Sequence, residues 1–140
     1  MTGPSKQLSW AELACKDGTP YPREWADRAA VLAAEFEAVR AVCGQPLVVL
    51  SAFRTAEHNR AIGGARNSQH VQGRALDVKP PKGWTVARLY DVIRSRAGMA
   101  ASAINGIGIY GGFVHFDIRP LRADGRLTVW RGSRAWAEAR

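Results

Sequence analysis

The segment Phe113–Ile118 constrains the fold most strongly, because its apolar and polar residues alternate with a period of two. On a β-strand, His115 and Asp117 share one face and the apolar residues share the other. The apolar face needs a hydrophobic core to cover it, whereas the polar face suits a cleft. The segment therefore predicts a sheet that is buried on one face and carries polar groups on the other.

The remaining elements are helices and strands without β-α-β alternation, which indicates an α+β fold. Apolar spacing predicts a long helix over 23–43, stopped by Gly44, and a second helix over 86–96. A short helix followed by a loop is expected within 55–69. Strands are expected at 47–50, 73–78, 107–110, 113–118 and 127–130, with Asp124-Gly125 as a hairpin turn between the last two. The length of 140 residues predicts a single domain over 1–140, with 1–7 and 132–140 as loose tails.

The charge balance narrows the classes of partner. Twenty Lys and Arg against twelve Asp and Glu give a formal net charge of +8. Such a surface favours polyanions such as nucleic acid, anionic lipid or a phosphate-rich cell wall. The basic residues form no basic tract, and the chain has no phosphate-binding glycine loop and no zinc-finger pattern, which argues against a specific nucleic-acid binder or nuclease. No apolar run is long enough to span a membrane.

The two cysteines and the N-terminus say little about function. Cys15 and Cys43 fit no metal or redox motif, and the sequence leaves open whether they form a disulfide or two buried thiols. The residues after Met1 lack the basic and apolar regions of a secretory signal. We therefore expect a chain that does not export itself by the general route, or one whose signal has been removed. The sequence leaves its oligomeric state open.

Two of the three histidines stand near acids in informative places. His70 ends a polar loop and is followed seven residues later by Asp77, and His115 lies in the alternating strand. Two imidazoles and one carboxylate make a catalytic zinc site that keeps a position open for water, which permits amide hydrolysis without a protein nucleophile. Spacing alone also allows hydrogen-bonded structural histidines or a simple ion pair. We call His70, Asp77 and His115 the metal triad.

The motifs around these residues resemble the zinc D-alanyl-D-alanine metallopeptidase family. The motifs are Ser68-x-His70-x-x-Gly73-x-Ala75-x-Asp77 and Val114-His115-x-Asp117, with Leu13–Gly18, Ser51–Thr55 and Gly63-Gly64 as leading segments. The resemblance covers most of the chain. Because the family shares its fold with the hedgehog signalling domain, it implies an antiparallel sheet with flanking helices.

The resemblance also implies roles for single residues. It implies Zn²⁺ as the cofactor and the metal triad as its ligands. Arg54 matches an arginine that holds a substrate carboxylate or carbonyl near the metal, a task that suits a guanidinium fork; a surface salt bridge is the alternative. Ser68 matches the serine beside the ligand and binds substrate or fixes the loop. Tyr110 is expected to line a peptide groove, or else to belong to the core.

The general base is the point where the sequence departs from the family. Better-known members carry an acid three residues before the last histidine ligand, and here that position is Gly112. Asp117 is the leading replacement because it shares a strand face with His115. It acts either as the base or as a residue that orients the imidazole, and the sequence leaves both open. His58 is a weaker candidate, more typical of a helix surface.

The resemblance implies a zinc metallopeptidase that hydrolyses peptide bonds in peptidoglycan stem peptides. It would be a D-Ala-D-Ala carboxypeptidase or an L,D- or D,D-endopeptidase, and the scissile bond depends on pocket shape. Its place of action would be the cell wall or periplasm, either as a bacterial remodelling enzyme or as a phage or prophage lysin. The basic surface would favour an anionic wall. The alternative is a catalytically weak or inactive zinc-binding module that recognises a wall or protein partner, which Gly112 keeps open.

Overall fold

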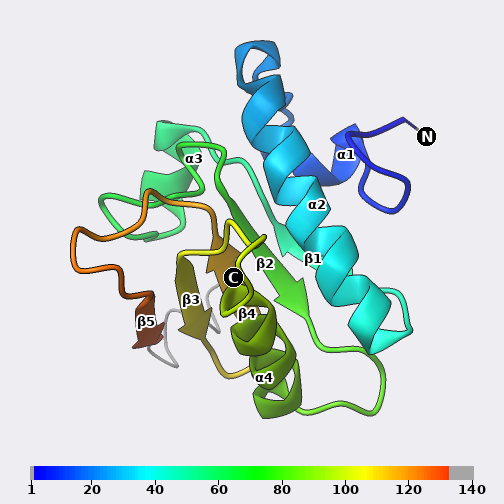
Figure 1. Ribbon diagram of the computed structural model, residues 1–140. Coiled ribbons are helices and arrows are strands. Elements are labelled where there is room, and N and C mark those ends of the chain that lie inside the picture. Colours follow the sequence, from blue (N-terminus) through cyan, green and yellow to red (C-terminus); the bar gives the residue numbers. More distant parts are fainter. Residues whose placement is uncertain (1, 133–140) are drawn as a thin grey trace.

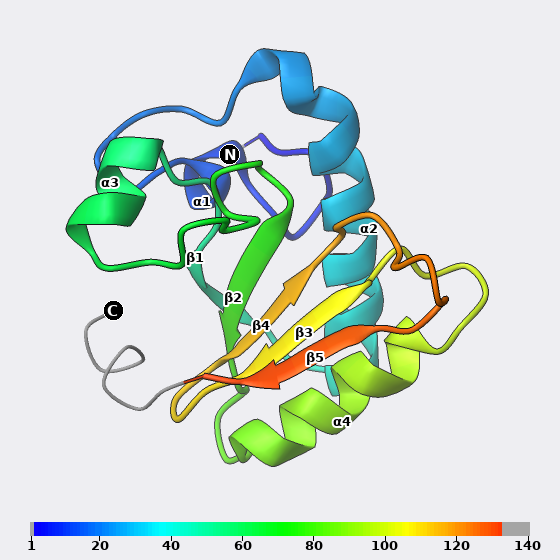
Figure 2. The same ribbon diagram turned by 90° about the vertical axis from the view of Figure 1, so that its left-hand side faces the viewer.

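The computed structural model describes residues 2–132, in which two long helices lie against one face of a five-stranded sheet (Figures 1 and 2). The helical segments are α1 (Trp10–Leu13), the 3₁₀ turn η1 (Arg23–Trp25), α2 (Ala26–Cys43), α3 (Ala56–Ala61) and α4 (Val86–Ala97). The strands are β1 (Val48–Ser51), β2 (Ala75–Lys79), β3 (Gly106–Ile109), β4 (Val114–Asp117) and β5 (Thr128–Arg131). The α+β class is confirmed, and the order of elements agrees with the sequence prediction.

The sheet has the order β1-β2-β4-β3-β5, and its neighbouring strands are antiparallel except for β3 and β5, which are parallel. The predicted hairpin at Asp124-Gly125 is therefore wrong. The turn itself forms, since the Gly125 amide donates to the Arg122 carbonyl at 2.9 Å. However, β2 and β3 already occupy both edges of β4, so β5 pairs with the free edge of β3 instead. Turn chemistry predicts a reversal of the chain but not which edge is free.

The core lies between α2, α4 and the apolar face of the sheet. Leu32, Phe36 and Val39 of α2 are at most 1% exposed, and they recur at helical spacing as the sequence predicts. Leu76 of β2 and Phe116 of β4 are fully buried in the same cluster. Gly44 ends α2 in the left-handed region at φ 66°, where a residue without Cβ is favoured. One sheet face is thereby committed to packing, and the other is left for polar groups.

Contacts at the N-terminal end hold residues 2–7 against α2. The Glu37 carboxylate accepts hydrogen bonds from Ser5 Oγ at 2.6 Å and from the Gln7 amide at 2.7 Å. The predicted C-terminal tail, 132–140, lies outside the described residues apart from Gly132. Cys15 and Cys43 are both buried free thiols.

Gly73 has a packing role. Its φ is 68°, and a Cβ there would lie 2.7 Å from the Trp25 ring and 3.0 Å from the Tyr21 hydroxyl. That hydroxyl donates to the Gly73 carbonyl at 2.7 Å. The missing side chain of Gly73 therefore lets the loop before β2 pack against aromatic rings.

A buried carboxylate on α2 connects this helix to the end of α4 and the chain that follows. Glu35, with a side chain 3% exposed, accepts hydrogen bonds from Arg96 Nε at 2.9 Å and Nη2 at 3.1 Å. It also accepts from Ser102 Oγ at 2.8 Å and the Ala103 amide at 3.2 Å. Burial raises the pKa of Glu35, but these hydrogen bonds outweigh burial, so its pKa lies below the usual value.

Replacing Glu35 with glutamine is expected to lower the free energy of unfolding at pH 7 by about 2–3 kcal/mol, because charge-assisted hydrogen bonds are lost in a buried setting. A carboxyl whose pKa is depressed by folding stabilises above its unfolded pKa, about 4.3, and loses that contribution as the pH falls further. The difference between wild type and E35Q should therefore shrink in acid. Urea unfolding at several pH values measures it. The exposed Glu24→Gln is the control; an equal loss in both variants would contradict the prediction.

Candidate metal centre

One row of paired residues crosses the whole sheet on its polar face. The register pairs Ser51 with Asp77, Asp77 with His115, His115 with Gly108, and Gly108 with Trp130. Because side chains alternate along a strand, these residues face away from the core. Two members of the metal triad, Asp77 and His115, are therefore direct cross-strand neighbours.

His70 reaches this row from the loop between α3 and β2. Its Nδ1 lies 2.6 Å from the Ala52 carbonyl oxygen, and its own carbonyl accepts from the Arg54 amide at 3.1 Å. Ser68 Oγ accepts from the His70 amide at 3.1 Å. The loop is thus attached to the segment that follows β1, and Ser68 contributes to this by bonding backbone, which is one of its two predicted roles.

Three ligand atoms of the metal triad meet at one point. His115 Nδ1 lies 3.0 Å from Asp77 Oδ1 and 3.2 Å from His70 Nε2, and His70 Nε2 lies 3.1 Å from Asp77 Oδ1. The three residues are at most 5% exposed. Zinc bonds of about 2.0–2.1 Å place the ligand atoms of a tetrahedral site roughly 3.3–3.4 Å apart. The triangle is close to this size, so the residues fit a metal ion.

Each imidazole has one ring nitrogen that faces the triad and one that faces away from it. The hydrogen bond made by the nitrogen that faces away explains why the other nitrogen can bind a cation. A carbonyl oxygen only accepts, so His70 Nδ1 carries the proton that goes to Ala52. Burial lowers the pKa of His70 to about 4, which leaves its Nε2 bare at neutral pH. His115 Nε2 lies 2.7 Å from Asp117 Oδ2 and donates its proton to this oxygen in a hydrogen bond. Two nitrogen lone pairs and a carboxylate oxygen therefore converge in an arrangement that can hold a cation.

The charges around the triad keep its carboxylate ionised. Burial raises the pKa of Asp77, but in the metal-free protein the neighbouring His70 and His115 imidazoles outweigh burial and hold that pKa well below its usual range. Burial lowers the pKa of His115, but hydrogen bonds to Asp117 and Asp77 outweigh it and raise that pKa. In the absence of a metal, His115 is thus the imidazole of the triad that is protonated more readily. A divalent cation replaces such a proton when it binds.

Asp117 lies on the far side of the His115 ring from the other triad atoms. Its Oδ2 contacts His115 Nε2, whereas the triad uses His115 Nδ1. Arg119 donates to both carboxylate oxygens, at 2.8 Å from Nε and 2.7 Å from Nη2. Burial raises the pKa of Asp117, but these hydrogen bonds hold it below its usual range. Of the two predicted roles, this geometry supports orienting the imidazole rather than acting as the general base.

Arg54 is buried beside the triad rather than forming a surface salt bridge. It is 1% exposed, and its Nη2 contacts Asp77 Oδ2 at 3.3 Å. Its Nε donates to Ser51 Oγ and its Nη1 to Asn59 Oδ1, each at 3.1 Å. The guanidinium thus holds the oxygen of Asp77 that the two imidazoles do not use. It also lines the cavity above the triad.

A cavity of about 520 Å³ opens over the triad. It is lined by Arg54, Arg66, Ser68, His70, Tyr110, His115, Arg119 and Trp130, among others. None of the described lining residues is an aspartate or glutamate, although Arg54 and Arg119 are paired with Asp77 and Asp117 behind the wall. Tyr110 stacks on Phe113 with ring centroids 4.6 Å apart and accepts from Trp130 Nε1 at 2.9 Å. His58 does not line the cavity.

Comparison with known proteins agrees with this chemistry. The family model described as Peptidase M15 matches residues 6–117, which is most of the chain. The chain belongs to the peptidase M15 family. Membership identifies it as a metallopeptidase, and the metal triad is a group within it that can hold the metal. No curated protein matches it. Among residues 2–132, no helix is long and apolar enough to cross a membrane.

Two residues at the metal centre of this M15 peptidase, Arg119 and Trp130, were not predicted from the sequence. Arg119 follows Asp117 at the two-residue spacing of a strand, so the alternation of side chains could have placed Arg119 on the same face as Asp117. Trp130 lies on β5, outside the matched residues, and its ring is 5.1 Å from that of His115. Gly108 makes this possible, because a Cβ there would lie 2.6 Å from the indole. No local signal predicts that contact, since it depends on the pairing of β5 with β3.

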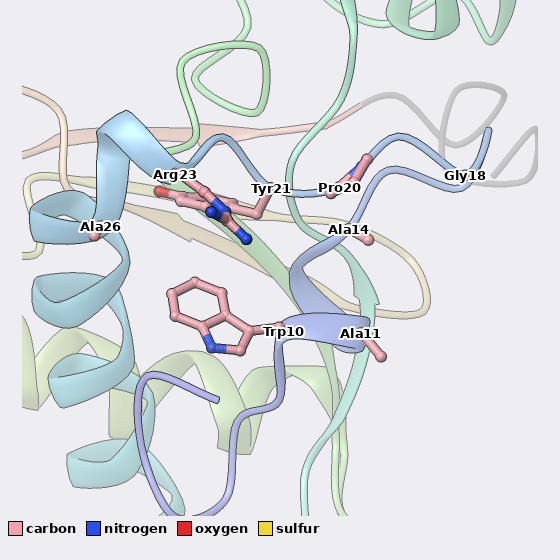
Figure 3. Close-up of a pocket in the computed structure, with 8 residues that line it drawn as sticks. All are labelled: Trp10, Ala11, Ala14, Gly18, Pro20, Tyr21, Arg23 and Ala26. Carbon is pink, nitrogen blue, oxygen red and sulfur yellow. The ribbon is translucent and has the colours of Figure 1, made fainter. Parts of the chain in front are cut away.

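A larger cavity, of about 640 Å³, lies between α1 and the start of α2. The Trp10 and Arg23 side chains extend into it (Figure 3), and small residues such as Ala14 and Gly18 are part of its lining. Its lining has no histidine, cysteine or carboxylate among the described residues. The cavity over the metal triad is the smaller of the two, but it is the one lined by groups that can bind a metal.

Proposed function

We propose that this M15 peptidase uses Zn²⁺, held by the metal triad, to hydrolyse peptide bonds in peptidoglycan stem peptides. The observation that carries the proposal is the convergence of three acceptor atoms, 3.0–3.2 Å apart, under a cavity lined by arginines. Two imidazoles and one carboxylate are the donors of catalytic zinc sites that keep a position open. When bound, zinc supplies a Lewis acid that polarises a carbonyl and activates water.

The residues around the triad support an anionic peptide as the substrate. Arg54, Arg66 and Arg119 line the cavity; since Arg54 and Arg119 already hold Asp77 and Asp117, Arg66 is the arginine whose guanidinium can make a two-point contact with a substrate carboxylate. A stem peptide ends in a carboxylate, which suits removal of terminal D-alanine; cleavage within the stem remains part of the proposal. The net charge of +8 favours adhesion to an anionic wall, where a bacterial enzyme or a phage lysin would act.

Each neighbouring residue then has an assigned task. Arg54 holds Asp77 and presents positive charge to the substrate carboxylate. Asp117 holds the His115 ring in the tautomer that leaves Nδ1 free, and is a positioning residue. Ser68 holds the loop of His70, and Tyr110 forms the cavity wall with Trp130.

A second candidate is a zinc-binding module that recognises a wall or protein partner and cleaves weakly or not at all. The observation in its favour is the missing acid. Gly112 is exposed in the turn between β3 and β4, and the described cavity lining has no carboxylate. A peptidase normally needs a group that accepts a proton from the attacking water. This candidate predicts metal binding without turnover.

Mass spectrometry of purified peptidoglycan tests the two candidates. Zinc-loaded protein is expected to release free D-alanine or stem-peptide fragments, and His70→Ala should release neither because it removes one ligand. The products identify the scissile bond. A protein that binds zinc and yet releases nothing from walls of several stem compositions would overturn the peptidase proposal and support the binding module.

A further inference from the structure

A second group of metal-ligating side chains lies outside the cavity of the triad. One ligand atom each from Cys15, Asp17 and His58 lies within 4.8 Å of the other two. Cys15 and Asp17 belong to the turn after α1, whereas His58 belongs to α3. We propose that these three residues, the second cluster, bind a further divalent cation of the zinc type, separate from the ion of the metal triad.

The turn that carries two of the donors has a defined backbone. The Cys15 amide donates to the Thr19 carbonyl at 2.9 Å, and the Gly18 amide donates to the Cys15 carbonyl at 3.0 Å. The Thr19 amide donates to Asp17 Oδ1 at 2.9 Å. These bonds close the turn on itself, so the thiol and the carboxylate are presented from one short rigid segment.

Thr55 connects this turn to the helix that carries His58. Its Oγ1 donates to Asp17 Oδ2 at 2.8 Å and accepts from the His58 amide at 3.1 Å. Hydrogen bonds of this kind orient the ligating carboxylates of metal sites, and they leave further lone pairs for the ion. Bonds from Thr19 and Thr55 to its two oxygens therefore fix the orientation of the Asp17 carboxylate.

The donor types select the cation. A thiol, an imidazole and a carboxylate combine soft, borderline and hard atoms, a set that suits zinc and is poor for magnesium or calcium. Cys15 is buried, whereas Asp17 is exposed and His58 is half-buried, so the ion would enter from the side of the carboxylate. A bound ion would join the turn after α1 to α3, next to Arg54 in the chain. Its binding should therefore stabilise the fold.

Cobalt binding tests the proposal without relying on activity. In the His70→Ala background, where the triad is incomplete, Co²⁺ is expected to produce a thiolate-to-cobalt charge-transfer band. Cys15→Ser in the same background should lose this band, because serine supplies no thiolate. Cys43→Ala is the matched control: it removes the other buried cysteine and should keep the band. The wild type should hold one more equivalent of Zn²⁺ than its Cys15→Ser variant.

His58→Ala provides a second test if Cys15→Ser does not fold, and it should weaken Co²⁺ binding at least tenfold. The proposal is overturned if His70→Ala shows no thiolate band, if the band survives in both Cys15→Ser and His58→Ala, or if it disappears with Cys43→Ala. A thiolate band in His70→Ala, together with a zinc-loaded wild type that cleaves no peptidoglycan, would support the second cluster while contradicting the peptidase proposal. The two proposals therefore fail separately.

Discussion

Asp77→Asn is expected to abolish tight zinc binding and to lower peptidase activity by roughly 10³-fold or more, since a bound metal supplies several kcal/mol of transition-state stabilisation. Asparagine has the size of aspartate but no charge. The triangle of acceptor atoms then loses its only anionic member, and Arg54 loses the carboxylate 3.3 Å from its Nη2. Metal content after dialysis and peptide release measure the two effects.

The control for this variant is Asp91→Asn, the same chemical change at an exposed position on α4. It should retain both zinc and activity. Circular dichroism checks that Asp77→Asn is folded, and His70→Ala removes a ligand without changing the ion pair of Arg54. If both triad variants kept their metal and their activity while folded, the assignment of the metal triad would be wrong.

Asp117→Asn is expected to weaken zinc binding by about 10–100-fold, the usual effect of removing a group that orients a ligand. The carboxylate accepts the proton of His115 Nε2 at 2.7 Å, which leaves Nδ1 free to bind. An asparagine amide can instead donate to Nε2 and favour the tautomer in which Nδ1 carries the proton. Competition with a chromophoric chelator measures the affinity.

Saturating zinc separates the two roles considered for Asp117. If the residue orients His115, excess zinc should restore activity to within a few-fold of wild type. If activity stays low with the metal fully bound, Asp117 acts as the base and the orienting role is wrong. Asp124→Asn is a matched control, because Asp124 also pairs with an arginine two residues away, at 2.7 Å from Arg122, but is exposed and outside the cavity.

Much of this fold could be predicted from local patterns. Helical spacing and Gly44 define α2, and the period of two in β4 separates the core residues Val114 and Phe116 from His115 and Asp117. These signals work because one side chain's face depends only on its position in a regular element. The Asp124-Gly125 turn shows the limit: local chemistry predicts that the chain reverses, but the strand it then joins depends on which edge is unoccupied.

The sequence by itself therefore determined the helices, the strands, the polar strand face and the residue types of the metal triad. Only the tertiary structure decided that Asp77 and His115 are cross-strand neighbours and that β5 brings Trp130 beside them. It also decided that Asp117 contacts the outer nitrogen of His115 and that Arg54 contacts Asp77. The physical reason is that periodicity sets the direction of a side chain, whereas its partner depends on strand order and on chain segments distant in sequence.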